Sequence, residues 1–245
     1  MAQDVPKRTE LPIIALLPNL VTLAAICAGL TAIRFGFHGH YERAVLLILL
    51  ACVFDAVDGR LARLLKSESK MGAELDSLAD FLNFGVAAPL LLYLFALQDM
   101  RNAGWIAALI FALCCVIRLA RFNVQSKAET DDRAGRHFVG VPAPAGAIIV
   151  MLPMFMSFLV AEEPVIPATA IAVWMVIVGL LMISTIRTYS FKMLTISRSN
   201  ARFYLLGAMV LLAAVLTYIW MTLVLLALVY IIGVFWAWGA GRRGE

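Results

Sequence analysis

The sequence predicts an all-α membrane protein, a polytopic bundle of about eight transmembrane helices. Of its 245 residues, 63% are hydrophobic and 15% are charged, and the mean hydropathy is +0.92. Soluble domains carry about 25% charged residues, so a water-soluble globular domain is excluded. The apolar runs continue for roughly 20 residues, which is the length of one membrane helix. They do not alternate with polar residues as the strands of a membrane barrel do.

The chain divides into apolar stretches that each match one membrane crossing. Residues 11–33 carry no charge and exceed the length of a signal-peptide core, so they are expected to form an uncleaved first span. Five more spans are expected at residues 43–63, 75–97, 102–122, 141–160 and 165–187. Residues 201–238 carry no charge after Arg202, and at about 1.5 Å per residue they exceed one bilayer crossing. They predict a tight hairpin of two spans with its turn near residues 218–222.

Prolines and cysteines inside these apolar runs point to structure rather than chemistry. Pro142, Pro144 and Pro153 predict that the fifth span starts or kinks at these positions. The four cysteines have no CxxC spacing. They therefore predict neither a disulfide framework nor a zinc site.

The basic residues predict the orientation of the bundle. With eight spans, all but three of the 20 Lys and Arg residues fall on the side of the two termini, the exceptions being Arg34, Arg43 and Arg101. Cytoplasmic loops are enriched in Lys and Arg, so both termini are expected in the cytoplasm of a bacterium, with the protein crossing its inner membrane. The net charge of +4 is explained by basic loops that face anionic membrane lipids. No nucleic-acid partner is expected.

Four aspartates interrupt the second and third predicted spans near their cytoplasmic ends. Asp55 and Asp58 are three residues apart and Asp76 and Asp80 are four apart, so each pair lies on one helical face. Carboxylates that lie together in a medium of low dielectric repel each other unless they take up protons or bind a cation. Oxygen ligands suit Mg²⁺ or Mn²⁺, and four carboxylates can hold two ions. For either pair alone, capping of a helix end in the headgroup region is the simpler interpretation.

The aspartates belong to a longer string, D-x2-D-G-x2-A-R-x8-G-x3-D-x3-D, which runs from Asp55 to Asp80. This string resembles the signature of the CDP-alcohol phosphotransferase family. The resemblance implies a six-helix membrane core over residues 11–192. Residues 201–238 would then form an additional C-terminal transmembrane hairpin, and residues 1–245 a single membrane-embedded domain. A homodimer is also implied.

The resemblance further implies the donor substrate, CDP-diacylglycerol, and the leaving group, CMP. Asp55, Asp58, Asp76 and Asp80 would hold two divalent cations on the diphosphate. Asp80 would also be the catalytic base that removes the proton of the acceptor hydroxyl. Five residues match family positions that contact the nucleotide and the diphosphate, namely Asn19, Thr22, Gly59, Arg63 and Ser69. Taken alone, the Asn and Thr side chains are more typical of hydrogen bonds between membrane helices.

The acceptor is suggested by four segments that resemble the phosphatidylserine synthase branch of the family, at residues 76–85, 118–123, 140–145 and 184–192. The carboxylate of L-serine needs a cation in the site. Arg118 and Arg121, which share one helical face, are the first choices, and Lys192 is the third. Anchoring to lipid phosphates explains each of these cations equally well.

Two alternatives stay open. Glycerol 3-phosphate, inositol phosphate or another alcohol is compatible with the same chemistry. A transporter that couples to ions or protons would also place aspartates within the membrane. Transporters carry such charges near the midplane of several helices, often in repeated halves. The present aspartates cluster on one hairpin at one membrane face, which favours the enzyme.

The predicted orientation can be tested by cysteine labelling. We expect a membrane-impermeant maleimide, applied to intact cells, to label Glu163→Cys in the third external loop and to leave Ser67→Cys unlabelled until the cells are opened. The physical reason is that residues 64–70 join two spans on the side that collects the basic residues. Labelling of Ser67→Cys alone in intact cells would reverse the orientation.

Overall fold

In the computed structural model, the described residues are 13–100, 102–128, 140–160, 163–184 and 201–241, and the regular elements in these ranges are helices without a strand. The all-α prediction is thereby confirmed. A short 3-10 turn (η1, Ile13–Leu16) opens the structure, and the helices follow as α1 (Leu17–Phe37), α2 (Tyr41–Leu64), α3 (Lys70–Asp80), α4 (Ala88–Ala96), α5 (Asn102–Ala128), α6 (Ala143–Val150), α7 (Leu152–Val160), α8 (Ala168–Ile183), α9 (Ala201–Thr217) and α10 (Ile219–Gly241).

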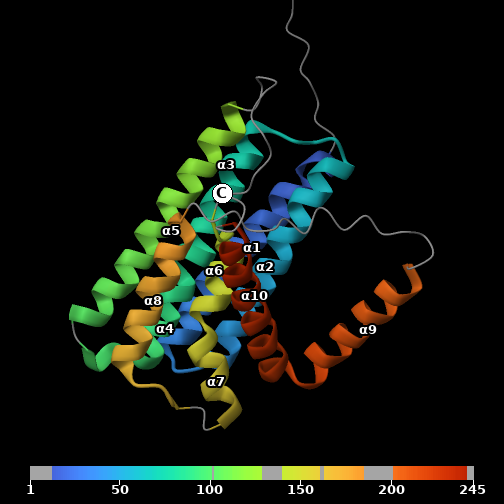
Figure 1. Cartoon of the computed structure of the whole chain (residues 1–245). Helices are drawn as coiled ribbons and strands as arrows, with labels where there is room; N and C mark the ends of the chain where they lie inside the picture. The colour runs from blue at the N-terminus through green and yellow to red at the C-terminus, as the bar shows by residue number, and fades with distance from the viewer. Residues whose placement is uncertain (1–12, 101, 129–139, 161–162, 185–200, 242–245) are drawn as a thin grey trace, which may run out of the picture.

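Most of these helices lie side by side in one bundle (Figure 1). Helices α1 and α2 pack closely because their facing positions carry small side chains, among them Ala25, Ala28 and Ala51. The larger core joins α2, α4 and α5 to α6, α7 and α8, and Phe84 and Phe111 are fully buried in it. Small residues at the contacts let helix backbones approach each other, which is the main way that membrane helices gain packing energy.

The third predicted span starts earlier than expected and contains a change of helix type. Helix α3 begins at Lys70 instead of residue 75, because the Ser69 side chain accepts a hydrogen bond from the Gly72 N–H at 3.0 Å and caps the helix. A π-helical turn (η2, Phe81–Ala87) then links α3 to α4, so the helix is continuous over Lys70–Ala96. Such turns occur frequently at functional sites, and this one follows Asp80 directly.

The fifth predicted span is interrupted, as its prolines indicate. Helix α6 ends at Val150 and α7 begins at Leu152. Pro153 has no N–H to donate to the carbonyl of Ile149, four residues earlier. That carbonyl instead accepts a hydrogen bond of 3.0 Å from the indole N–H of Trp174 on α8.

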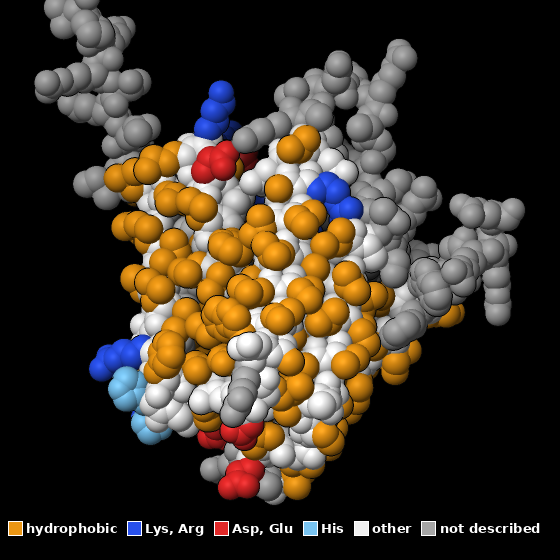
Figure 2. Space-filling model, turned by 90° about the vertical axis from the view of Figure 1, so that its left-hand side faces the viewer, with side chains coloured by type: hydrophobic (Ala, Val, Ile, Leu, Met, Phe, Trp, Pro, Cys, Tyr) orange, Lys and Arg blue, Asp and Glu red, His pale blue; other side chains and the backbone are white. Residues whose placement is uncertain are grey.

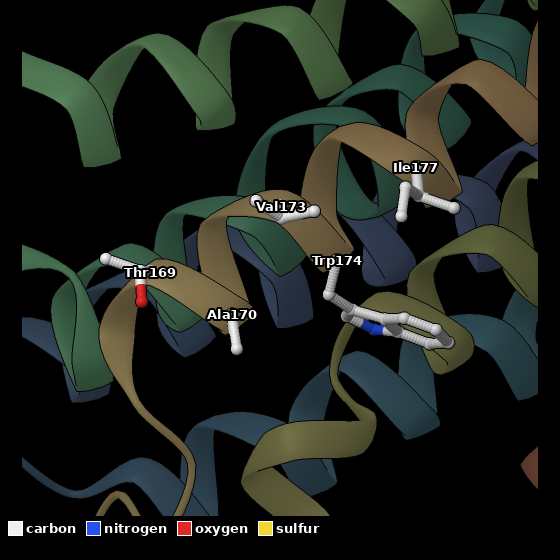
Figure 3. A pocket seen from close by; sticks show the side chains of 5 residues that line it. All are labelled: Thr169, Ala170, Val173, Trp174 and Ile177. Carbon is white, nitrogen blue, oxygen red and sulfur yellow. The ribbon is translucent and has the colours of Figure 1, made fainter.

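Figure 3 shows Trp174 beside an apolar cavity of about 370 Å³ on the first half of α8, which Thr169, Ala170, Val173 and Ile177 also line.

The C-terminal helices turn at Tyr218, at the start of the predicted turn. Helix α10 packs against α6 and α7, whereas α9 diverges from the bundle (Figure 1). The described large side chains of α9 are mostly exposed, and Leu216 is one of them. Whether the two helices form the predicted hairpin of membrane spans stays a prediction.

Four helical segments are long and apolar enough to cross a membrane, namely Ile14–Phe37, Lys70–Ala96, Asn102–Gln125 and Ala143–Val160. Helix α2 is also long, but its second half carries Asp55, Asp58 and Arg60. Figure 2 shows a broad hydrophobic surface with charged side chains gathered toward its two ends. A surface of this kind suits contact with lipid. The count of eight spans stays a prediction.

Candidate active site

Three aspartates converge where α2 meets the beginning of the α3–η2 helix. Asp55, Asp76 and Asp80 each offer a carboxylate oxygen, and these oxygens lie within 4.8 Å of one another. The four-residue spacing of Asp76 and Asp80 sets both on the same face of α3. Asp55 reaches them from α2, whose C-terminal half lies at the same end of the bundle. The convergence predicted from the spacing is therefore present for these three side chains.

The chemistry of this cluster fits a divalent metal ion. All three side chains are half-buried and supply oxygen donors only, and the shared distance of 4.8 Å lets one ion touch each of them. Carboxylates held so close in a poorly polarisable environment repel each other, and a cation removes that repulsion. Oxygen donors of this kind are the ligands that Mg²⁺ and Mn²⁺ prefer.

The fourth aspartate has a different environment. Asp58 is only 3% exposed, and its Oδ2 accepts a hydrogen bond of 2.5 Å from the Thr22 hydroxyl on α1. Its other oxygen, Oδ1, is buried and has no hydrogen-bond partner within the described part of the chain. A buried carboxylate oxygen without a partner is costly, so Asp58 retains one oxygen that a ligand can engage. The structure thus brings three of the four predicted metal ligands together and holds Asp58 beside them.

A cavity of about 280 Å³ adjoins the cluster and shares Asp76 with it. Its walls come from the start of α1, the end of α2 and the start of α3. All five residues that the sequence suggests for the nucleotide and the diphosphate line it, namely Asn19, Thr22, Gly59, Arg63 and Ser69. Asp58 also contributes to this wall.

Two glycines of the motif shape this cavity. A Cβ atom at Gly72 would lie 2.9 Å from Asn19 Oδ1 and 3.1 Å from Ser69 Oγ, so any larger residue would displace these polar side chains from their present positions. At Gly59 the nearest atom to an added Cβ would be Arg63 Nη1 at 4.0 Å. The Gly59 backbone therefore faces open space, where a ligand can approach it.

The basic side chains that the sequence suggests for binding the acceptor carboxylate differ in their contacts. The Arg121 Nη1 donates a hydrogen bond of 3.0 Å to the Ile183 carbonyl at the end of α8. Arg118 is half-buried and interacts electrostatically with Asp80 and Asp55, but its guanidinium makes no hydrogen bond or ion pair with any residue that the structure describes. Lys192 lies outside the described residues.

Three polar side chains close to the cluster were not assigned a role from the sequence. Asn83, in the π-turn one helical turn beyond Asp80, is 1% exposed, and its Oδ1 lacks a hydrogen-bond partner among the described residues. It packs against α1 at Gly29, where a Cβ would collide with it. Ser77 and Asn123 exchange hydrogen bonds of 3.0 and 3.2 Å between α3 and α5. In the sequence, Asn83 is distinguished by being a single amide side chain within an apolar membrane segment.

Comparison with known proteins gives a family match over most of the chain. The model of the family described as CDP-alcohol phosphatidyltransferase matches residues 15–182. A protein of Mycobacterium tuberculosis named CDP-diacylglycerol–serine O-phosphatidyltransferase is 46% identical over 146 residues, which cover 58% of this chain and 51% of that protein. A Helicobacter pylori protein of the same name is 35% identical over 181 residues, covering 72% of this chain and 73% of that one. The chain thus spans about half the length of the mycobacterial relatives.

Among solved structures, a phosphatidylinositol phosphate synthase of Mycobacterium tuberculosis in complex with manganese and citrate aligns with a TM-score of 0.46 and 25% identity. The alignment covers 70% of this chain and 78% of that one.

The acidic cluster should bind Mn²⁺ in the absence of any substrate. We expect electron paramagnetic resonance titration of the purified protein to show bound Mn²⁺ that Mg²⁺ displaces. Asp76→Asn should weaken the affinity about tenfold or more, or at least about 1.4 kcal/mol, because one charged ligand is lost.

The matched control is Asp99→Asn, which neutralises an exposed aspartate in the short η3 turn (Gln98–Met100) outside the cluster. It should leave Mn²⁺ affinity unchanged. Equal affinities for Asp76→Asn and the unmodified protein would remove Asp76 from the metal site.

Proposed function

The chain belongs to the CDP-alcohol phosphatidyltransferase family, and we propose that it transfers the phosphatidyl group of CDP-diacylglycerol to the hydroxyl of L-serine, releasing CMP. The observation that carries the proposal is the trio of carboxylates beside a cavity that is lined by the rest of the family motif. The relatives named as serine phosphatidyltransferases support serine as the acceptor.

The donor would occupy the cavity between α1, α2 and α3. Asn19, Ser69 and the Gly59 backbone offer polar contacts to the nucleotide, and the Arg63 guanidinium offers paired N–H donors to a phosphate. Asp55, Asp58, Asp76 and Asp80 would hold two divalent cations, Mg²⁺ or Mn²⁺. When bound, these cations supply positive charge to the diphosphate and to the departing CMP.

The acceptor would enter on the side of the cluster that faces α5. Asp80 takes the proton from the serine hydroxyl, and the hydroxyl oxygen forms a bond to the phosphorus that carries the diacylglycerol. The bond from that phosphorus to the bridging oxygen breaks, and its electron pair leaves with CMP. Arg118 binds the serine carboxylate, because it lies in the field of Asp80 and its donors are uncommitted among the described residues. The Arg121 guanidinium instead donates a hydrogen bond to the Ile183 carbonyl at the end of α8.

The membrane arrangement belongs to the same proposal. The cavity opens at the end of the bundle where α2 ends and α3 begins. This is the end that the basic residues assign to the cytoplasm, where a water-soluble acceptor is available and CMP can leave. The diacylglycerol chains of donor and product remain in the lipid of the inner membrane, beside the apolar faces of the helices. The family resemblance also favours a homodimer.

The proposal is tested by an acceptor screen that follows CMP release from CDP-diacylglycerol in Mn²⁺ or Mg²⁺. We expect release with L-serine and none after addition of EDTA. Asp80→Asn should abolish release, because the amide cannot take the proton. CDP-diacylglycerol binding should change by no more than about tenfold, or 1.4 kcal/mol.

Two outcomes would contradict this assignment in different ways. Release with glycerol 3-phosphate but not with serine would replace the acceptor and leave the metal chemistry in place. Normal turnover by Asp80→Asn would remove Asp80 as the base.

The two arginines of α5 should behave differently. Arg118→Ala should raise the KM for serine by about ten- to a hundredfold, the effect of losing a charge-assisted hydrogen bond of roughly 1.5–3 kcal/mol. The KM for CDP-diacylglycerol should change little. Arg121→Ala, the matched control on the same helical face, should lower thermal stability while leaving the ratio of the two KM values unchanged. The reverse pattern would exchange the roles of the two residues.

A further inference from the structure

Three hydroxyl side chains line the cavity that adjoins the acidic cluster, and two of them are engaged within the protein. Thr22 donates a hydrogen bond of 2.5 Å to the Asp58 carboxylate. Ser69 accepts the bond of 3.0 Å from the Gly72 N–H that caps α3. Ser67 is the third, and its Oγ is buried without a hydrogen-bond partner among the described residues. Of the three, Ser67 is the one whose hydrogen-bonding capacity is unused.

The turn that ends α2 sets the position of Ser67. The Ser67 N–H donates a hydrogen bond of 3.0 Å to the Ala62 carbonyl, and the Lys66 N–H donates one of 3.3 Å to the Arg63 carbonyl. These two bonds form the Schellman arrangement that closes many helix C-termini, with Lys66 in the left-handed conformation at a φ of 49°. Glycine is the usual residue there, because a side chain makes this conformation unfavourable. Backbone conformations of this kind cluster at active sites and ligand-binding sites, and here the turn holds Ser67 in the cavity wall.

Two simpler roles for Ser67 do not fit. A serine before a helix often caps it, but Ser69 is the residue that caps α3. A hydroxyl that stabilises the folded chain is hydrogen-bonded within it, whereas a buried hydroxyl without a partner costs free energy. A ligand in the cavity would supply the missing partner. Rotation about the Cα–Cβ bond gives the hydroxyl three staggered positions, so it can meet a ligand without a movement of the backbone.

The place of Ser67 along the cavity indicates which part of a ligand it meets. Asp58 is seven residues before Leu65, the C-cap of α2. Asp76 is seven residues after Ser69, the N-cap of α3. At about 1.5 Å per residue, both carboxylates lie about 10 Å along their helices from the loop that carries Ser67. A diphosphate held by cations at the carboxylates therefore leaves the nucleoside nearer to the loop.

We propose that Ser67 is a donor-binding residue, whose hydroxyl forms a hydrogen bond with the nucleoside of the CDP-linked donor and of the CMP product. Ser67 lies in the stretch of eight variable positions between Arg63 and Gly72 of the motif, so the motif itself assigns it no role. This inference rests on the proposed function, because it requires the donor to occupy this cavity. It does not depend on which alcohol is the acceptor.

The test measures binding of CMP to the full-length protein in Mn²⁺ by isothermal titration calorimetry, with inorganic phosphate as a competing second probe. Ser67→Ala should weaken CMP binding about three- to tenfold, the range for the loss of one hydrogen bond between neutral groups. The affinity for inorganic phosphate should be unchanged, because phosphate has no nucleoside.

Ser184→Ala is the matched control. Ser184 also follows the end of a helix, but its hydroxyl donates a hydrogen bond of 2.7 Å to the Leu181 carbonyl and it lies outside the cavity wall. The variant should change neither affinity.

Thermal stability separates a binding role of Ser67 from a structural one. Ser67→Ala removes a buried hydroxyl without a partner, so the Tm of the unliganded variant should equal or exceed that of the unmodified protein. CMP should raise the Tm of the variant by less. A lower Tm without ligand, or failure to fold, would show that the hydroxyl stabilises the chain and would overturn the inference. Unchanged CMP affinity, or an equal loss of affinity for CMP and phosphate, would overturn it as well.

The proposed function fails separately. If the unmodified protein does not bind CMP in Mn²⁺, the donor site and this inference both fall. If it binds CMP but uses an acceptor other than serine, the proposed acceptor falls and this inference stands.

Discussion

The mutual repulsion of three carboxylates is the strongest electrostatic constraint in this molecule. Asp55, Asp76 and Asp80 share a space less than 5 Å across, inside a bundle whose other side chains are mostly apolar. Such an arrangement persists when the carboxylates take up protons or when positive charge lies close by. Positive charge can come from two sources. The carboxylate oxygens can bind a cation, and the half-buried Arg118 guanidinium interacts electrostatically with Asp80. Helix packing holds the three side chains together, with Asp55 on α2 and Asp76 and Asp80 on α3.

Helix ends form the rest of the site, and this explains why small residues recur there. The cavity forms where the start of α1, the end of α2 and the start of α3 meet. A methyl group at Gly72 would displace the Asn19 side chain, and the capping Ser69 fixes where α3 begins. The same Ser69 lines the cavity, so one residue both ends a loop and forms part of the cavity wall. Local helix geometry and the shape of the cavity therefore depend on the same few positions.

The fold and part of the site could be predicted from the sequence, because apolar runs and helical spacing involve residues that are close together in the chain. The all-α fold, the family and the approach of the third and fourth motif aspartates to the first were expected on those grounds. Asp58 was expected within the same cluster, but its bond to Thr22 depends on how α1 packs against α2. The start of α3 at Lys70 depends on the hydrogen bond between the Gly72 N–H and the Ser69 side chain, and hydropathy does not reveal such a cap.

The interruption between α6 and α7 leaves one backbone carbonyl of α6 without its partner within the helix. Pro153 removes the backbone bond that would stiffen this point, and a hinge would ordinarily result. Here the freed Ile149 carbonyl is held by the Trp174 indole of another helix. In a lipid interior no water could take the place of that bond. The indole therefore supplies the partner that Pro153 cannot, and it ties α6 to α8 at the break, while α7 beyond the break packs against α10.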